Sequence, residues 1–236
     1  MTGIDEQLAQ TPADETLDQL ARAARALRTD GSSTSALSAV VTQAIETITP
    51  ATSAGLIELE HGRLVPKATH GAAPLVLDHL QQQLGAGPCI DTARDQSVTV
   101  IDDTATDGRW PRFAAAAAEI GVRSMLCAPL WVDQRRLGTL SVYGPTVRAF
   151  GEAERRVAAL YATLAALALA DGQRVANLNL ALDNRDIIGQ AKGILIERHR
   201  LTAEAAFELL SKTSQNTNQK LLAVAETLIA TGELPD

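Results

Sequence analysis

The sequence contains two cysteines, Cys89 and Cys127, whose thiols are the groups best suited to covalent or redox chemistry. Cys89 follows a Gly-Ala-Gly-Pro turn and could be a redox or covalent sensor, and Cys127 lies in a predicted strand from which it could meet Cys89. A thiol reductase built on both residues would need the two sulfurs within disulfide reach. The alternative is that each cysteine is a small, buried hydrophobic residue, which is the more common role.

Arg109 and Trp110 complete the set of residues predicted for a ligand pocket. The Arg109 guanidinium could hold an anionic ligand. Trp110 precedes Pro111 and is expected to cover a sheet edge, where its N–H can find a partner. The histidines include no pair at metal-ligand spacing, and the cysteines form no Cys-x-x-Cys pair, so neither a metal site nor a cofactor is predicted.

A stripe of basic and small residues occurs near the C-terminus. Arg185, Gly189, Lys192 and His199 are spaced so that they share one face of a helix. Glycine on such a face opens the backbone to a ligand; alternatively, the charges only keep the helix in water and the glycines let two helices pack. Residues 185–220 hold six Lys and Arg against four Asp and Glu, whereas the whole chain has a net charge of −7. A nucleic acid would therefore meet a local patch and not a basic domain.

Three short helices are predicted to position this stripe. The second begins after Thr202, a good N-cap, and the third ends at Gly232. The predicted core faces are Ile187, Ile188, Ala191, Ile194 and Leu195 in the first helix, Ala206, Phe207, Leu210, Thr213 and Ser214 in the second, and Leu221, Leu222, Ala225, Leu228 and Ile229 in the third.

The segment from about Asn184 to Gly232 resembles the ANTAR domain, a three-helix RNA-binding module of transcription antiterminators. The resemblance rests on the run 185–196 with its Gly-Gln-Ala-Lys-Gly core and on residues 204–207 and 210–216. It implies binding to paired (tandem) RNA stem-loops in nascent transcripts, which prevents a terminator hairpin from forming. The residues expected to face RNA are Arg185, Gln190, Lys192, Gly193 and Arg198 on the first helix and Ser214, Gln215, Asn218 and Lys220 near the turn between the second and third helices. Base stacking would fall to Arg198, His199 or Arg200, since Phe207 is the only aromatic residue after Tyr161.

A mixed region of helices and strands precedes this module, which is typical of an α+β sensor domain. Helices are predicted over 35–48 and 75–84, and strands over 53–60, 63–69, 97–101, 124–132 and 137–143, with the first two strands joined across His61-Gly62. The order fits a sheet with helices at its edges and ends.

Residues 33–148 resemble a GAF domain, particularly the version found beside ANTAR in actinobacterial regulators. The resemblance rests on residues 85–89, 107–111, 121–130 and 138–143. It implies an antiparallel sheet with flanking helices and a pocket between the sheet and the 70–110 segment. Because GAF ligands are diverse, the signal, a small molecule or a protein, stays open.

A long helix is predicted to join the two domains, because residues 151–182 contain no proline and many alanines. A heptad-like seam runs through Val157, Leu160, Leu164, Leu167, Asp171, Val175, Leu178 and Leu182. The preferred interpretation is a parallel coiled coil in a homodimer, with two RNA-binding heads for two stem-loops. The alternative is a monomer whose helix packs on its own sensor domain. Residues Leu17, Leu20, Ala24 and Leu27 predict an N-terminal helical segment that could cover the same interface or the RNA surface.

The sequence therefore predicts four parts: an N-terminal helical segment 1–31, a GAF sensor 32–150, a linker helix 151–183 and an ANTAR bundle 184–236. We expect a signal-controlled, RNA-binding transcription antiterminator and no enzyme, since no catalytic residue set is recognisable. Two alternatives remain, a sensory dimer that acts through a protein partner and a GAF-type thiol redox enzyme. A cytoplasmic protein without membrane contact is expected, because no secretion signal and no apolar run of about 20 residues is present.

Overall fold

The computed structural model describes residues 18, 21–22, 24–25, 33–60 and 62–235. Most of the predicted N-terminal helical segment 1–31, and His61 between the first two strands, lie outside the described residues. The chain forms two compact units, Met1–Gly172 and Gln173–Asp236. Within the described residues, no helix is long and apolar enough to span a membrane.

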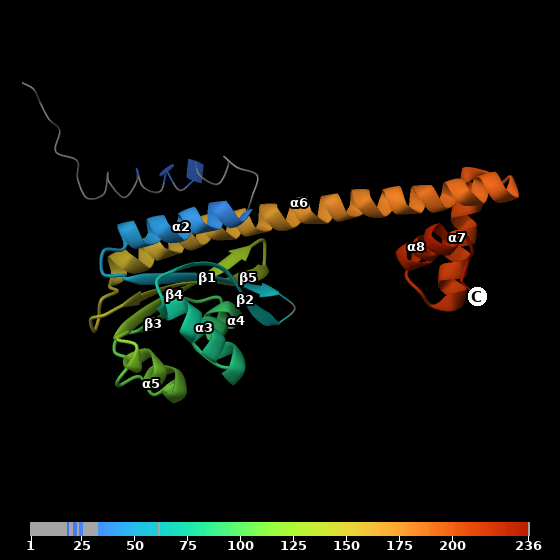
Figure 1. Cartoon of the computed structure of the whole chain (residues 1–236). Coiled ribbons are helices and arrows are strands. Elements are labelled where there is room, and N and C mark those ends of the chain that lie inside the picture. Colours follow the sequence, from blue (N-terminus) through green and yellow to red (C-terminus); the bar gives the residue numbers. More distant parts are fainter. Residues whose placement is uncertain (1–17, 19–20, 23, 26–32, 61, 236) are drawn as a thin grey trace, which may run out of the picture. The chain divides into compact units, whose positions relative to one another are not determined.

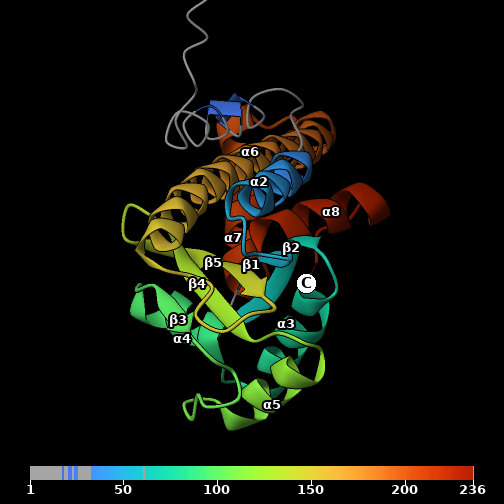
Figure 2. The same ribbon diagram turned by 90° about the vertical axis from the view of Figure 1, so that its left-hand side faces the viewer.

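The first unit is built on a five-stranded antiparallel sheet in the order β2-β1-β5-β4-β3. The strands are β1 (Ser53–Glu60), β2 (Arg63–His70), β3 (Thr99–Ile101), β4 (Ser124–Val132) and β5 (Arg135–Gly144). Helix α2 (Ser33–Thr47) and the start of α6 (Glu152–His199) cover one face, while α3 (Ala73–Leu84), α4 (Pro88–Asp95) and α5 (Pro111–Glu119) lie on the other (Figures 1 and 2). This architecture confirms the predicted α+β class.

Strand alternation divides the buried residues into two cores. Successive side chains of a strand point to opposite faces, so Leu126 and Ala128 of β4 pack towards α2 and α6, whereas Met125 and Cys127 pack towards α3, α4 and α5. Strand β4 therefore contacts both layers of helices. Its Cys127 faces α3, α4 and α5, and its Leu126 and Ala128 face α2 and α6.

The start of α6 is held on the sheet by a face rich in alanine. Its buried residues are Ala158, Tyr161, Ala162, Ala165, Ala166 and Leu169. Leu160 and Leu167 of the predicted coiled-coil seam are about half exposed on another side of the helix. Helix α6 also continues without a break to His199, so the predicted linker and the first predicted helix of the ANTAR bundle are one helix.

The second unit contains the end of α6 with α7 (Ala203–Thr217) and α8 (Leu221–Thr231). The Thr202 hydroxyl accepts a hydrogen bond from the Ala205 N–H at 3.2 Å, and Gly232 ends α8 in the left-handed conformation, as predicted. The core consists of Ala191, Leu195, Ala206, Leu210, Val224, Ala225 and Leu228. Two predicted core residues are instead exposed, Phe207 at 43% and Ile229 at 36%.

Candidate functional site

The two cysteines meet in the core of the first unit. Cys89 lies in the first turn of α4 and Cys127 in the middle of β4, and their Sγ atoms are 3.8 Å apart. Neither side chain has any exposed surface. The two sulfurs are therefore close enough to each other for the thiol chemistry that the sequence suggested, but both are fully buried.

The Gly-Ala-Gly-Pro turn fixes the position of Cys89. Gly87 has a φ of 157°, and a Cβ atom there would lie 2.4 Å from the side-chain oxygen of Gln81. Because glycine has no Cβ, the Gln81 amide comes close enough to accept a hydrogen bond from the Cys89 N–H at 2.7 Å. The Thr139 hydroxyl donates to the Cys89 carbonyl at 3.0 Å, so α3 and β5 both hold the start of α4.

Polar groups surround the thiols inside this core. The Tyr143 hydroxyl donates to Asp78 Oδ1 at 3.3 Å, and burial raises the pKa of the Asp78 carboxyl to about 7. Burial, together with the neighbouring Cys89 and Asp78, also raises the pKa of the Cys127 thiol well above its usual value. Among the described residues, Asp78 Oδ2 and Gln81 Nε2 are buried without a hydrogen-bond partner.

Arg109 and Trp110 lie next to each other and use their polar groups within the domain. The Arg109 guanidinium pairs with Asp107 and donates to the Val100 carbonyl at 2.6 Å, and it stands 4.5 Å from the centre of the Trp110 ring. The Trp110 N–H donates to Asp91 Oδ2 at 2.9 Å. Asp107 raises the pKa of Arg109, which stays charged but is already paired.

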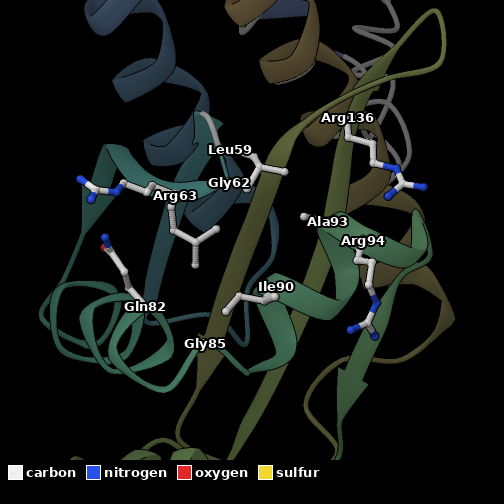
Figure 3. A pocket seen from close by; sticks show the side chains of 10 residues that line it. Leu59, Gly62, Arg63, Gln82, Gly85, Ile90, Ala93, Arg94 and Arg136 are labelled. Carbon is white, nitrogen blue, oxygen red and sulfur yellow. The ribbon is translucent and has the colours of Figure 1, made fainter.

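A cavity of about 670 Å³ lies between the sheet and α3 and α4, in the region where the sequence predicts a pocket (Figure 3). It is lined by Leu59, Gly62, Arg63, Leu64, Gln82, Gly85, Ile90, Ala93, Arg94 and Arg136. Cys89, Arg109, Trp110 and Cys127 do not line it, although Ile90 follows Cys89 directly. Figure 3 shows the guanidinium of Arg63 on one side and those of Arg94 and Arg136 on the other, all pointing away from the centre. Nowhere in the described chain do three or more His, Cys, Asp or Glu side chains gather to hold a metal ion.

The second unit presents a smooth helical face on α6. Arg185, Gly189 and Gly193 follow at four-residue intervals and are exposed, with Gln190 and Lys192 beside them. A Cβ atom added at Gly189 or Gly193 would have no neighbour within 4 Å. Packing within the described chain therefore does not require either glycine.

Other predicted RNA-facing residues have partners in the bundle. Arg198 donates to the Gly232 carbonyl at the end of α8, and the Ser214 hydroxyl donates to the Gln219 carbonyl at 2.6 Å. Asn218 ends α7 in the left-handed conformation. Of the four residues predicted near this turn, Gln215, Asn218 and Lys220 are exposed.

Phe207 lies at the surface, although its position in the sequence predicts a core residue. Its ring is 43% exposed, and Lys192 Nζ lies 6.0 Å from the ring centre. Helix geometry could have indicated this exposure, because the Phe207 side chain points about 90° away, around the helix axis, from the mean direction of Ala206, Leu210 and Thr213. The second unit thus presents an exposed aromatic ring beside a lysine.

Two family models match this chain. The GAF domain matches residues 30–170, more than half of the chain, and the ANTAR domain matches residues 176–229. The chain belongs to the GAF–ANTAR family of regulators. The first unit of this GAF–ANTAR protein contains the GAF domain, and Gly189, Gly193 and Phe207 lie in the segment matched by the ANTAR domain.

Solved structures support the fold of the GAF domain. The GAF domain of an Acinetobacter phosphoenolpyruvate-protein phosphotransferase is 19% identical, with a TM-score of 0.58 over 69% of this chain and 96% of that one. A free methionine-R-sulfoxide reductase from Neisseria meningitidis, in complex with its substrate, is 15% identical, with a TM-score of 0.56 over 71% and 95%. At these identities the likeness concerns the fold alone. No curated protein sequence matches this GAF–ANTAR protein.

Proposed function

We propose that this protein is a signal-responsive transcription antiterminator, in which the ANTAR domain binds paired RNA stem-loops and the GAF domain controls that binding. The observation that carries the proposal is the pair of exposed glycines, Gly189 and Gly193, inside a helix. Each costs about 1 kcal/mol of helix stability relative to alanine, and neither is needed for packing in the described unit. Binding of a partner that approaches the helix backbone closely would explain why glycine occupies both positions.

RNA suits this face because its neighbours are of the types that bind nucleic acid. Arg185 and Lys192 can contact phosphate, and Gln190 can both donate and accept hydrogen bonds at base edges. The exposed Phe207 ring supplies the aromatic stacking surface that single-stranded loops use. Gln215, Asn218 and Lys220, at the turn after α7, complete the proposed surface. We assign Arg198 and Ser214, which contact backbone carbonyls of the bundle, a supporting role.

We propose that α6 joins two copies of the chain. The seam residues Leu160, Leu167, Leu178 and Leu182 lie within about 60° of one another on a helix that advances about 100° per residue, and all four are exposed. In the GAF domain this side of α6 lies opposite the alanine-rich face that packs on the sheet. A second copy of α6 would bury the leucines and bring together two RNA-binding heads for two stem-loops.

The thiol redox enzyme is a weaker candidate. Cys89 and Cys127 are close enough for disulfide chemistry, but both are fully buried and neither lines the cavity. A substrate the size of an amino acid would have no path to the sulfurs in this conformation. We therefore propose no catalytic activity for the chain.

A gel shift with the purified full chain tests the proposal. The probe is an RNA with two tandem stem-loops, compared with single-loop and scrambled RNAs. We expect binding that requires both loops and falls about tenfold or more for Lys192→Ala, whereas Lys212→Ala, an exposed lysine of α7 outside the proposed surface, leaves it unchanged. Absence of loop-dependent binding would overturn the RNA assignment and favour a protein partner.

A further inference from the structure

The Cys89–Cys127 contact joins two structural elements that are separate in sequence. These are the chain's only cysteines, and they come from a short helix and a central strand, 38 residues apart. Closing the gap from 3.8 Å to the roughly 2.05 Å of a disulfide requires only a small approach of the sulfurs.

The surroundings of the thiols differ from an ordinary apolar core. Asp78 and Gln81 each bury a polar atom without a partner close to this site, and such atoms oppose folding. Gly87 is also required for the Gln81 contact that anchors Cys89. A site that served packing alone would be more stable with apolar residues at these positions.

We propose that Cys89 and Cys127 are a redox-active pair that a hydroperoxide converts into a disulfide, and that this disulfide changes how α6 packs on the sheet. In the first step the Cys89 sulfur attacks one peroxide oxygen and the O–O bond breaks; Cys89 becomes a sulfenic acid, and the proton that its thiol gives up leaves with the other peroxide oxygen as water or an alcohol. In the second step the Cys127 sulfur attacks the sulfenic sulfur, forms the S–S bond and releases water. The peroxide is reduced by two electrons, and two thiols are oxidised to one disulfide.

The order of the steps follows from the positions of the two sulfurs. Cys89 occupies the first turn of α4, a helix that also lines the cavity. Cys127 lies on a buried strand, where burial raises the pKa of its thiol. Ile90, which follows Cys89, lines the cavity, so a small oxidant reaches α4 there when the helix opens locally.

Strand β4 gives the disulfide a route to α6. Cys127 faces α4, whereas its neighbours Leu126 and Ala128 belong to the core that also holds Ala162 and Ala165 of α6. A disulfide that shifts β4 towards α4 would therefore change the contacts that α6 makes on the opposite face of the sheet. This inference rests on the proposed function in one respect: it makes the disulfide the signal that controls RNA binding.

The first test measures the disulfide itself in the full-length protein. The reduced chain is treated with hydrogen peroxide, alkylated under denaturing conditions and digested. We expect the Cys89 and Cys127 peptides to become linked within one chain, with a mass 2 Da below the sum of the two peptides, and to separate after dithiothreitol. Cys89→Ala and Cys127→Ala should each abolish the link. Thiols that both stay alkylatable, or links only between chains, would overturn the proposal.

The second test follows α6 by hydrogen exchange in the reduced and oxidised wild type, which needs no variant to fold. We expect peptides covering residues 152–170 to change their exchange rates on oxidation; unchanged rates would overturn the coupling to α6. The gel shift is then repeated in both states, with a change of about tenfold or more expected. Equal RNA binding in both states would overturn the disulfide as a signal. Absence of RNA binding in both states would count against the proposed function alone, because the mass and exchange measurements do not depend on RNA.

Discussion

Lys192 Nζ lies 6.0 Å from the centre of the Phe207 ring, which joins α6 to α7 at the surface of the ANTAR domain. Stacking of one base on such a ring is worth about 1–3 kcal/mol. We therefore expect Phe207→Ala to weaken binding of tandem stem-loop RNA by about fivefold to a hundredfold, while Phe207→Tyr retains it. Filter binding measures the affinity. Equal losses in both variants would contradict a stacking role.

The exposed glycines allow a test in which stability and function move in opposite directions. Gly193→Ala should stabilise the protein by about 0.5–1 kcal/mol, because alanine is the better helix former and its Cβ meets nothing. The same methyl group would obstruct RNA at the helix backbone, so affinity should fall. Urea denaturation and gel shifts on the same samples measure both effects. A more stable variant with unchanged affinity would remove Gly193 from the RNA surface.

Opposite sides of α6 give a matched pair of variants for the dimer. Leu178 lies on the seam, whereas Leu180 is equally exposed but displaced by about 160° around the helix. Leu178→Lys should shift the protein towards monomer in sedimentation velocity experiments, and Leu180→Lys should not. A wild-type chain that is monomeric at all concentrations would rule out the α6 pairing.

The disulfide should also be visible in stability. A cross-link that closes a loop of 38 residues stabilises a protein by up to about 4 kcal/mol through the unfolded state. The peroxide-treated wild type should therefore unfold at a higher urea concentration than the reduced protein, and Cys127→Ala should show no such difference. Native-state strain would reduce the gain, and a lower midpoint after oxidation would show that closure distorts the core.

Asp78 predicts a dependence of stability on pH. Its pKa is raised from 3.8 to about 7 in the folded protein, so the folded state holds a proton that the unfolded state has lost between these values. This group's contribution to stability is therefore complete below pH 3.8 and decreases as pH rises to about 7, by up to about 4 kcal/mol. Asp78→Asn should gain stability relative to wild type between pH 5 and pH 8 in urea denaturation. The exposed Asp95→Asn, as control, should not show this gain.

Apolar strand sequences and helix-capping residues made much of this fold predictable. The strand 124–132 follows from its apolar sequence, and Thr202 and Gly232 mark their helix ends because side-chain capping and left-handed glycine are local effects. Helices α4 and α5 were not predicted. Helix α4 is short and polar, and the five successive alanines 114–118 of α5 carry no apolar periodicity, so tertiary packing decides both.

The candidate sites were less predictable than the fold. Both cysteines were recognised, but their 3.8 Å contact depends on how α4 packs across β4, which spacing in sequence does not determine. The exposure of Phe207 was not predicted, because an apolar residue at the edge of an apolar helix face cannot be distinguished from a core residue by its spacing alone. The roles of Arg198 and Ser214 in holding the bundle depend on backbone carbonyls that only the folded chain brings near.

Gly189 and Gly193 also affect how the proposed RNA-binding part of α6 moves. Each lacks the side-chain contacts that resist local opening, so the turn around Gly189 and Gly193 unwinds transiently at a lower cost than it would with alanine at these positions. An RNA held against that turn would suppress the opening, and part of its binding free energy would be spent on ordering the backbone. Affinity for RNA would then depend on temperature more steeply than the polar contacts alone imply, and the ANTAR domain would be most rigid when it is bound.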